Sequence, residues 1–143
     1  MLIQQISVFL ENKTGRIHEM AKILADAKIN IRALSLADAS DFGVMRLIVD
    51  QPAPAARRLR DSGLTVALTE VIAVEVEDRP GGFAEVMGLM ADAGINVEYM
   101  YAFVEKSRDN AILIFRIDNI KEASQLLLSK GLRILKAAEL LSL

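Results

Sequence analysis

Two polar features occur twice in the sequence, 66 residues apart, and both are of kinds that bind small ions or zwitterions. The first is a short loop that ends in glycine, Gly15 or Gly81, just before an apolar helical pattern. The second is an asparagine after that pattern, Asn30 or Asn96. Glycine lets the backbone approach a ligand closely, and the first turn of a helix presents free N–H groups that suit a carboxylate. An asparagine amide both donates and accepts hydrogen bonds, so it can bind either end of a zwitterion.

Residue types that usually carry catalysis are scarce. The chain has no Cys, which excludes disulfides, zinc–thiolate sites and thiol nucleophiles, and its one histidine, His18, has no cluster of carboxylates around it in the sequence. We find no Ser–His–acid set and no phosphate loop, so we expect neither an enzyme nor a bound metal or cofactor. The lack of Cys also suits the cytoplasm.

Charge and hydropathy exclude two classes of partner. The net charge is −2 and the charged residues, 25% of the chain, form no basic stripe, so we expect no binding to nucleic acid. Hydrophobic residues make up 52% of the chain, but no apolar run approaches the roughly 20 residues that a membrane span needs. The sequence therefore favours a globular chain with a small-molecule ligand.

An internal repeat shows which elements must position the polar features. Residues 1–70 and 71–143 share a strand-like alternation, then a helical period, then further strands and a shorter helix. Beyond Val104 the spacing becomes 68, which puts about two extra residues in the turn around Glu105 to Asn110. The expected element pairs are strands at 6–10 and 72–76, helices at 17–27 and 83–93, strands from 30 and 96, strands at 44–49 and 112–117, helices closed by glycines 63 and 131, and strands at 64–68 and 132–136.

This order predicts an α+β fold of two ferredoxin-like βαββαβ repeats, with antiparallel sheets and helices on one face. The stretch from Leu64 to Val76 is nearly continuous β-type sequence, so the last strand of the first repeat should run into the first strand of the second. Gly94 lies where a helix ends in a left-handed residue. Lys28, its counterpart, must adopt that conformation at some cost or end its helix differently.

The two polar features resemble the ACT family of small-molecule-binding regulatory domains. The second repeat carries the resemblance in Asp78-Arg79-Pro80-Gly81 and in Gly94-Ile95-Asn96-Val97, which enclose the helix. The first repeat departs from it, because Thr14 replaces the proline and Lys28 replaces the glycine. The resemblance covers nearly the whole chain and implies a non-catalytic regulatory protein.

In that family, paired domains set their sheets edge to edge and bind amino acids at the seam. Carried over to this chain, the loop of the first repeat would face Asn96, and the loop of the second would face Asn30. The resemblance also implies a homodimer and a partner enzyme or regulator. The residues implied to bind the ligand are Asn12, Lys13, Thr14, Gly15, Arg16, Ile17, Asn30, Asp78, Arg79, Pro80, Gly81, Gly82, Phe83 and Asn96.

Two alternatives stay open at this stage. The glycines and asparagines can serve only the turns and the starts of strands, and the basic loop residues can be solvated surface charge. The chain would then be a structural or interaction module, or a regulatory subunit of a biosynthetic enzyme with no ligand of its own.

Overall fold

The computed structural model describes residues 2–37, 40–103 and 109–143. The chain divides into two compact units, and each is described by itself below. The first unit is Gln4–Thr69, and the second unit is chiefly Glu70–Leu143. The predicted insertion around Glu105 to Asn110 lies largely on residues 104–108, outside the described residues. In the described part of the chain, no helix is long and apolar enough to cross a membrane.

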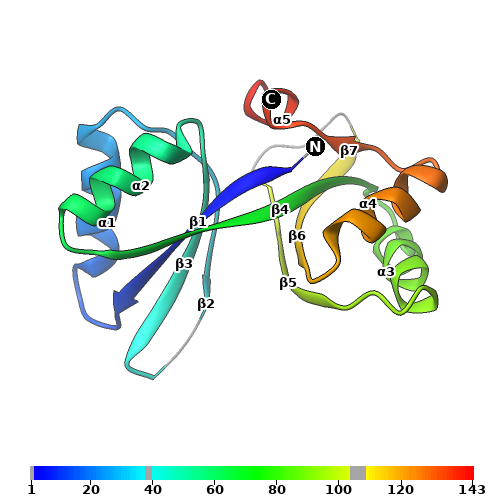
Figure 1. The fold of residues 1–143 in the computed structure, drawn as a ribbon, viewed down its shortest axis with the longest axis horizontal. Helices are drawn as coiled ribbons and strands as arrows, with labels where there is room; N and C mark the ends of the chain where they lie inside the picture. Colours follow the sequence, from blue (N-terminus) through cyan, green and yellow to red (C-terminus); the bar gives the residue numbers. More distant parts are fainter. Residues whose placement is uncertain (1, 38–39, 104–108) are drawn as a thin grey trace. The chain divides into compact units, whose positions relative to one another are not determined.

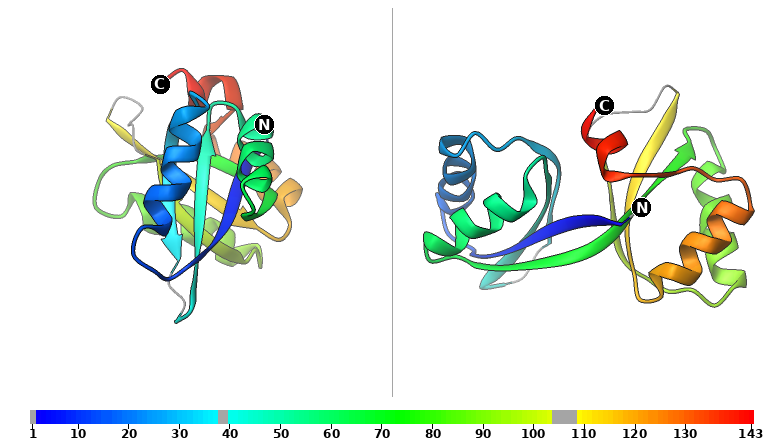
Figure 2. Two further views of the ribbon diagram at one scale, coloured as in Figure 1. Left: turned by 90° about the vertical axis from the view of Figure 1, so that its left-hand side faces the viewer. Right: turned by 45° about the horizontal axis from the view of Figure 1, so that its top comes forward.

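The first unit has the predicted βαββαβ order, with strands arranged as β2-β3-β1-β4. The pairs β1–β3 and β2–β3 are antiparallel, and both helices lie on one side of the strands (Figures 1 and 2). Its elements are β1 (Ile3–Glu11), α1 (Arg16–Asp26), β2 (Ile31–Ala37), β3 (Phe42–Val49), α2 (Pro52–Asp61) and the start of β4 (Thr65–Glu77). The α+β, ferredoxin-like prediction is confirmed, as is the continuous strand β4.

The second unit repeats this arrangement, with strands ordered β5-β6-β4-β7 and antiparallel pairing throughout. Its further elements are α3 (Gly82–Asp92), β5 (Val97–Ala102), β6 (Asn110–Ile117), α4 (Ile120–Ser129), β7 (Ile134–Leu135) and α5 (Ala137–Leu141). The expected last strand at 132–136 is much shorter than predicted, and α5 was not predicted at all. The Glu139 carboxylate accepts a hydrogen bond from the Lys136 N–H at 3.1 Å, which starts α5 and ends the strand.

The core of each unit lies between the sheet and its two helices. In β1, the alternating residues Ile6, Val8 and Leu10 point to the helices, and the register places them beside the equivalent face of β3. Met20 and Leu24 of α1 close over this face and are buried. The second unit buries corresponding residues, namely Ile72, Val74, Val76, Val86, Met90, Phe115 and Ile117. The same pattern of apolar residues therefore builds both cores.

Helices α1 and α3 end in the same way although their terminal residues differ. Lys28 has φ 58° and Gly94 has φ 70°, so both are left-handed. The N–H of Ile29 bonds to the carbonyl of Leu24 at 2.9 Å, which is the closing hydrogen bond of a Schellman motif. Of the two possibilities for Lys28, the structure shows the left-handed conformation. Its cost is offset because the motif places Ile29 in the core.

Exchanging the residue at these two positions measures that strain. Lys28→Gly should raise the free energy of unfolding by about 0.5–1 kcal/mol, because a left-handed side chain costs more than the unfolded-state entropy of glycine. Gly94→Lys should lower it by a similar amount, and a Cβ there would meet no atom within 4 Å, so the change reports the backbone alone. Urea unfolding measures both; a Lys28→Gly variant less stable than the parent would contradict the strain.

Candidate functional site

A small pocket opens at the head of α1 in the first unit, with a volume of about 170 Å³. The strand register explains why it forms there: Leu10 lies opposite Gly43, so the end of the sheet has little side-chain bulk at that point. Its floor is apolar and its rim is polar. The residues that line it are Leu10, Glu11, Asn12, Lys13, Ile17, Leu36, Ala37 and Gly43.

The second unit has a pocket at the same place, beside the head of α3, with a volume of about 310 Å³. It is lined by Val76, Glu77, Asp78, Arg79, Phe83, Met100, Ala111 and Leu113. Five of these residues lie 66 positions after a lining residue of the first pocket: Val76, Glu77, Asp78, Arg79 and Phe83. Ala111 of β6 corresponds to Gly43 of β3. Both pockets therefore arise from the fold that the two units share.

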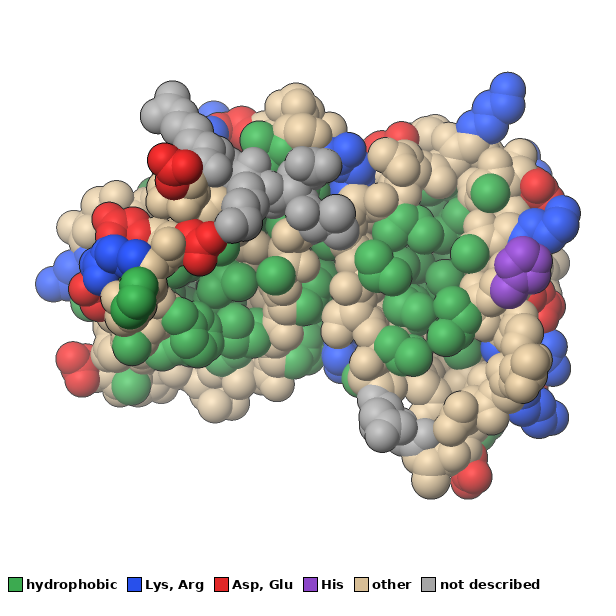
Figure 3. All heavy atoms as spheres, turned by 180° about the vertical axis from the view of Figure 1, so that it is seen from behind, with side chains coloured by type: hydrophobic (Ala, Val, Ile, Leu, Met, Phe, Trp, Pro, Cys, Tyr) green, Lys and Arg blue, Asp and Glu red, His purple; other side chains and the backbone are tan. Residues whose placement is uncertain are grey.

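Hydrophobic side chains are exposed around both pockets. Ile17, Leu34 and Leu36 are each about half exposed in the first unit, and Phe83 is 47% exposed in the second. Figure 3 shows hydrophobic side chains gathered on the surface of each unit. Exposed apolar groups next to a polar rim are typical of small-molecule sites.

The loop before each helix turns on a left-handed glycine. Gly15 has φ 90° and Gly81 has φ 86°, and neither helix has a side chain that caps its first turn. The first N–H of α3, at Gly82, is satisfied by the carbonyl of Arg79 at 3.0 Å. The rest of the first turn lacks a side-chain cap, so these helix heads can accept an anionic group.

Gly82 has a steric role that the first unit lacks. A Cβ at this position would lie 2.2 Å from the carbonyl oxygen of Glu77, which is too close for any side chain to be accommodated. The corresponding residue of the first unit is Arg16, which carries a Cβ, so the backbone at Glu11 must lie further from that position. The two loops therefore differ in backbone detail while sharing the same glycine turn.

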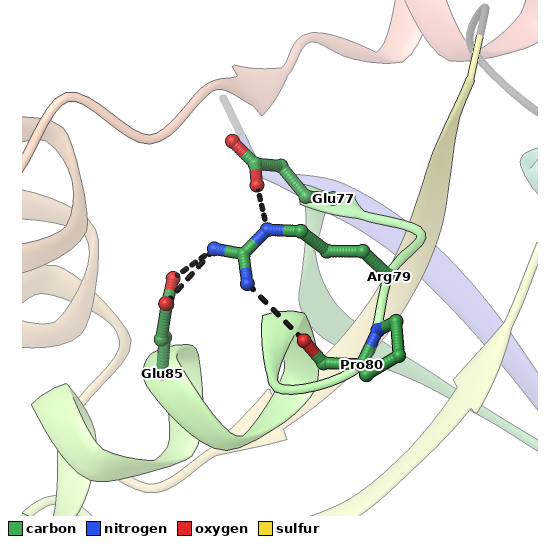
Figure 4. Close-up of polar contacts among 4 residues, drawn as sticks. All are labelled: Glu77, Arg79, Pro80 and Glu85. Atoms are coloured by element: carbon green, nitrogen blue, oxygen red, sulfur yellow. Dashed lines mark hydrogen bonds and ion pairs between the residues drawn. The ribbon is translucent and has the colours of Figure 1, made fainter.

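Ion pairs hold the loop of the second unit (Figure 4). Arg79 bonds through Nε to the Glu77 carboxylate and through Nη2 to both carboxylate oxygens of Glu85, each at 2.8 Å. Its Nη1 also donates to the carbonyl of Pro80 at 3.2 Å. The hydrogen bonds to Glu85 and Glu77 raise the pKa of Arg79 above its usual range. Arg79 thus ties the end of β4 to the first turn of α3.

The first unit ties the same two places with a different arginine. Glu11 and Glu19, which correspond to Glu77 and Glu85, both pair with Arg16, at 3.6 Å and 2.8 Å. The residue that corresponds to Arg79 is Lys13, and its ammonium pairs with Glu11 at 2.9 Å. The hydrogen bond from Lys13 is the largest of the effects that lower the pKa of Glu11. We call each set, two glutamates joined by an arginine, the bridged glutamate pair.

The two asparagines lie far from the loop of their own unit. Asn30 sits beside Asp50, which accepts its N–H at 3.0 Å, whereas the loop follows Glu11 opposite Phe42. The length of β3 separates these points, and its eight residues span roughly 25 Å at about 3.3 Å each. Asn96 precedes Val97, whose partner Ile117 is likewise at the far end of β6 from the loop. Loop and asparagine of one unit cannot touch the same small ligand.

The predicted residues therefore divide into four groups. The pockets gather Asn12, Lys13 and Ile17 in one unit and Asp78, Arg79 and Phe83 in the other. Arg16 and Gly82 line other depressions, with Glu19 and Glu85 respectively. Thr14, Gly15, Pro80 and Gly81 shape the turns, and Asn30 and Asn96 lie at the opposite ends of the sheets.

The sequence did not lead us to the strand residues that form the floors of the pockets. Gly43 and Ala111 are small residues at matching places in otherwise bulky third strands, and that contrast is a signal in the sequence. It also missed the bridged glutamate pairs, although the glutamates recur at the repeat spacing. Across the described residues, no group of three or more His, Asp or Glu side chains could bind a metal ion.

The fold and the paired pockets define the chain as a tandem of two ferredoxin-like domains, each with a pocket at the head of its first helix. It matches the ACT domain pair family over residues 1–143 and belongs to that family, whose members are regulatory domains. Protein BT0572 from Bacteroides thetaiotaomicron, of known crystal structure, is 36% identical, with a TM-score of 0.93 over 100% of this chain and 98% of that one.

More distant structures share the fold. The regulatory subunit of aspartate kinase from Thermus thermophilus is 16% identical, with a TM-score of 0.64 over 88% of this chain and 91% of that one. The same subunit from Thermus flavus is 15% identical, with a TM-score of 0.63 over 92% and 95%. No curated protein matches the chain.

The close contact at Gly82 gives a stability prediction. Gly82→Ala should lower the free energy of unfolding by about 2 kcal/mol or more, because the new methyl group overlaps the carbonyl of Glu77. Gly88→Ala, in the same helix with open space around it, should instead raise it by about 0.5–1 kcal/mol. Chemical denaturation of both variants checks this, and equal effects would show that the loop relaxes freely.

The Lys13–Glu11 pair gives a pH prediction. Lys13→Met should raise the pKa of Glu11 toward its ordinary value, because the hydrogen bond and charge that favour the carboxylate are removed. Since the folded pKa is depressed, the stabilisation exists above the unfolded pKa and is lost as the pH falls through the folded one. An NMR titration of the Glu11 carboxyl measures the shift. Lys22→Met, which disrupts a remote ion pair with Asp26, should leave the pKa of Glu11 unchanged.

Proposed function

We propose that the chain is a non-catalytic regulatory protein that senses a free amino acid. The supporting observation is the recurrence of one pocket, at the head of the first helix, in both units. Each pocket joins an apolar floor, a polar rim and a helix head without a side-chain cap. These three parts match the three parts of an amino acid.

The ligand carboxylate would bind at the head of α1 or α3, where peptide N–H groups and the helix dipole favour negative charge. Its ammonium would bind near the rim carboxylates, Glu11 or Glu77. The side chain would rest on the apolar floor, where burial favours it by about 25 cal/mol per Å².

Asn30 and Asn96 enter this proposal only through a second repeat. Each lies at the far end of its own sheet from the loop, so a ligand that contacts both a loop and an asparagine must be shared by two repeats. That sharing, within one chain or in a homodimer, is what the family resemblance implies. It would couple ligand binding to assembly and so give the signal an output.

The signal would pass to a partner enzyme or regulator. The fold is shared with subunits named as regulators of aspartate kinase, but that likeness extends to the fold alone. A ligand this small should bind with a Kd of roughly micromolar to hundreds of micromolar, which suits free amino-acid pools. The absence of Cys is consistent with a cytoplasmic setting.

A screen of the twenty amino acids by thermal shift and calorimetry tests the proposal. At least one should stabilise the chain, by about 2.7 kcal/mol when its concentration is 100 times the Kd. Ile17→Asp places a carboxylate beside the ligand carboxylate at a position that is 46% exposed, and should weaken binding about tenfold. Ile17→Asn has the same size without the charge and should weaken it much less.

No response to any amino acid would contradict the sensor function. The chain would then be an interaction module or an enzyme subunit without a ligand of its own. In that case Ile17→Asp would change assembly or partner binding alone.

A further inference from the structure

We infer that Glu85 competes with the ligand of the second pocket, because its carboxylate occupies the guanidinium of Arg79 that a bound amino acid would otherwise engage. This inference rests on the proposed function and adds a mode of regulation at the second pocket alone. It is carried by the place of Arg79 beside the helix head, by the contacts of its guanidinium, and by a difference between the two units.

Arg79 is the cationic residue among the described residues that line the second pocket. Its guanidinium lies over the turn that leads into α3, since a Cβ on Gly81 would be 3.7 Å from Nη1 of Arg79. The proposed function places the ligand carboxylate at this helix head. A guanidinium is a preferred partner of a carboxylate, because its N–H groups can bind both oxygens at once. Arg79 therefore lies next to the place where the anionic end of the ligand would bind.

Glu85 already provides a carboxylate for this guanidinium (Figure 4). Both of its oxygens accept a hydrogen bond from Nη2 of Arg79, each at 2.8 Å. The other two nitrogens are also engaged, because Nε donates to the Glu77 carboxylate and Nη1 donates to the carbonyl of Pro80. A ligand carboxylate can therefore bind Arg79 fully only when Glu85 releases it.

The contact between Arg79 and Glu85 is one that a ligand can displace. The two side chains are 45% and 66% exposed, and exposed ion pairs are weak because water screens them. Glu85 does not line the second pocket, since it lines another depression with Gly82. Until Glu85 is displaced, the ligand carboxylate has the backbone N–H groups of the helix head alone. Displacement uses part of the binding free energy, so the second site binds more weakly than its groups allow.

The described residues of the first unit show no such competition. The first pocket is lined by Lys13, which corresponds to Arg79 and pairs with a glutamate of β1. Glu19, the counterpart of Glu85, pairs instead with Arg16, which does not line that pocket. Loss of the helix glutamate should therefore affect the second site and not the first.

Calorimetry on the full chain with each of the twenty amino acids tests the inference. Glu85→Gln should raise the affinity of the ligand at one site about two- to fivefold, because the released guanidinium can bind its carboxylate. Glu19→Gln, the matched change in the first unit, should leave the affinities unchanged. Both positions are exposed, so the fold should tolerate the two changes.

Glu85→Asp separates the release of Arg79 from the loss of a negative charge. It keeps the carboxylate but is one methylene shorter, so the paired contact with Nη2 is lost while the charge remains. It should also raise the affinity, by a smaller factor than Glu85→Gln. An unchanged affinity in Glu85→Asp beside a gain in Glu85→Gln would show that charge alone acts at this site, and the inference would be wrong.

The outcomes separate this inference from the function on which it rests. If amino acids bind but Glu85→Gln leaves every affinity unchanged, the inference fails while the sensor function stands. The same holds if Glu19→Gln gives an equal gain, because the effect would then not depend on Arg79. If none of the twenty binds either the parent or Glu85→Gln, both fail.

Discussion

The structure depends on a turn that must lead from a buried strand into a buried helix within a few residues. Leu10 and Met20 are both fixed in the core of the first unit, so the chain between them has little freedom. A left-handed glycine, Gly15 or Gly81, makes that reversal possible without a side chain to cap the helix. The helix head is left open because the turn is tight. The uncapped helix head is thus a consequence of how the fold is closed.

The bridged glutamate pairs keep this tight turn in one conformation. Each joins the end of the first strand to the first turn of the helix, but Arg16 does so from the helix and Arg79 from the loop. The exchange is linked to Gly82, which leaves no room for any side chain where the first unit has Arg16. Exposed pairs of this kind contribute little to global stability, so their main effect is local. They also occupy the arginines, so in the proposed binding mode the ligand carboxylate would be bound by the backbone.

Much of the fold could be predicted because its signals are local or repeated. Alternation in β1 and the helical period of α1 follow from burial on one face, and the duplication presents each pattern twice. Comparison with Gly94 gave the left-handed conformation of Lys28 as one of two possibilities. Helix α5 could not, because it depends on a capping contact at Lys136 and on burial of Leu140 rather than on a long apolar stripe. Five residues are too few for a period to show.

The loops beside the two pockets could be predicted from sequence, but the pockets could not. A pocket floor is set by which residues face each other across strands, and Gly43 meets Leu36 only once β2, β3 and β1 are in register. The ion-pair partners of Arg16 and Arg79 depend on how far each side chain reaches, and the spacing of residues in the sequence does not determine this. The placement of Asn30 beside Asp50, a strand's length from the loop, likewise follows from antiparallel register.

Divergence of the two pockets is easier than divergence of the two cores. Core positions such as Leu24 and Met90 are fully enclosed, and a change in volume there costs roughly 1–5 kcal/mol. Ile17 and Phe83, by contrast, are about half exposed at the edge of the core, where most substitutions cost little. After duplication, selection for folding would hold the cores alike and leave the pocket rims free to change. The distribution of burial therefore allows the two pocket rims to differ while the two cores stay alike.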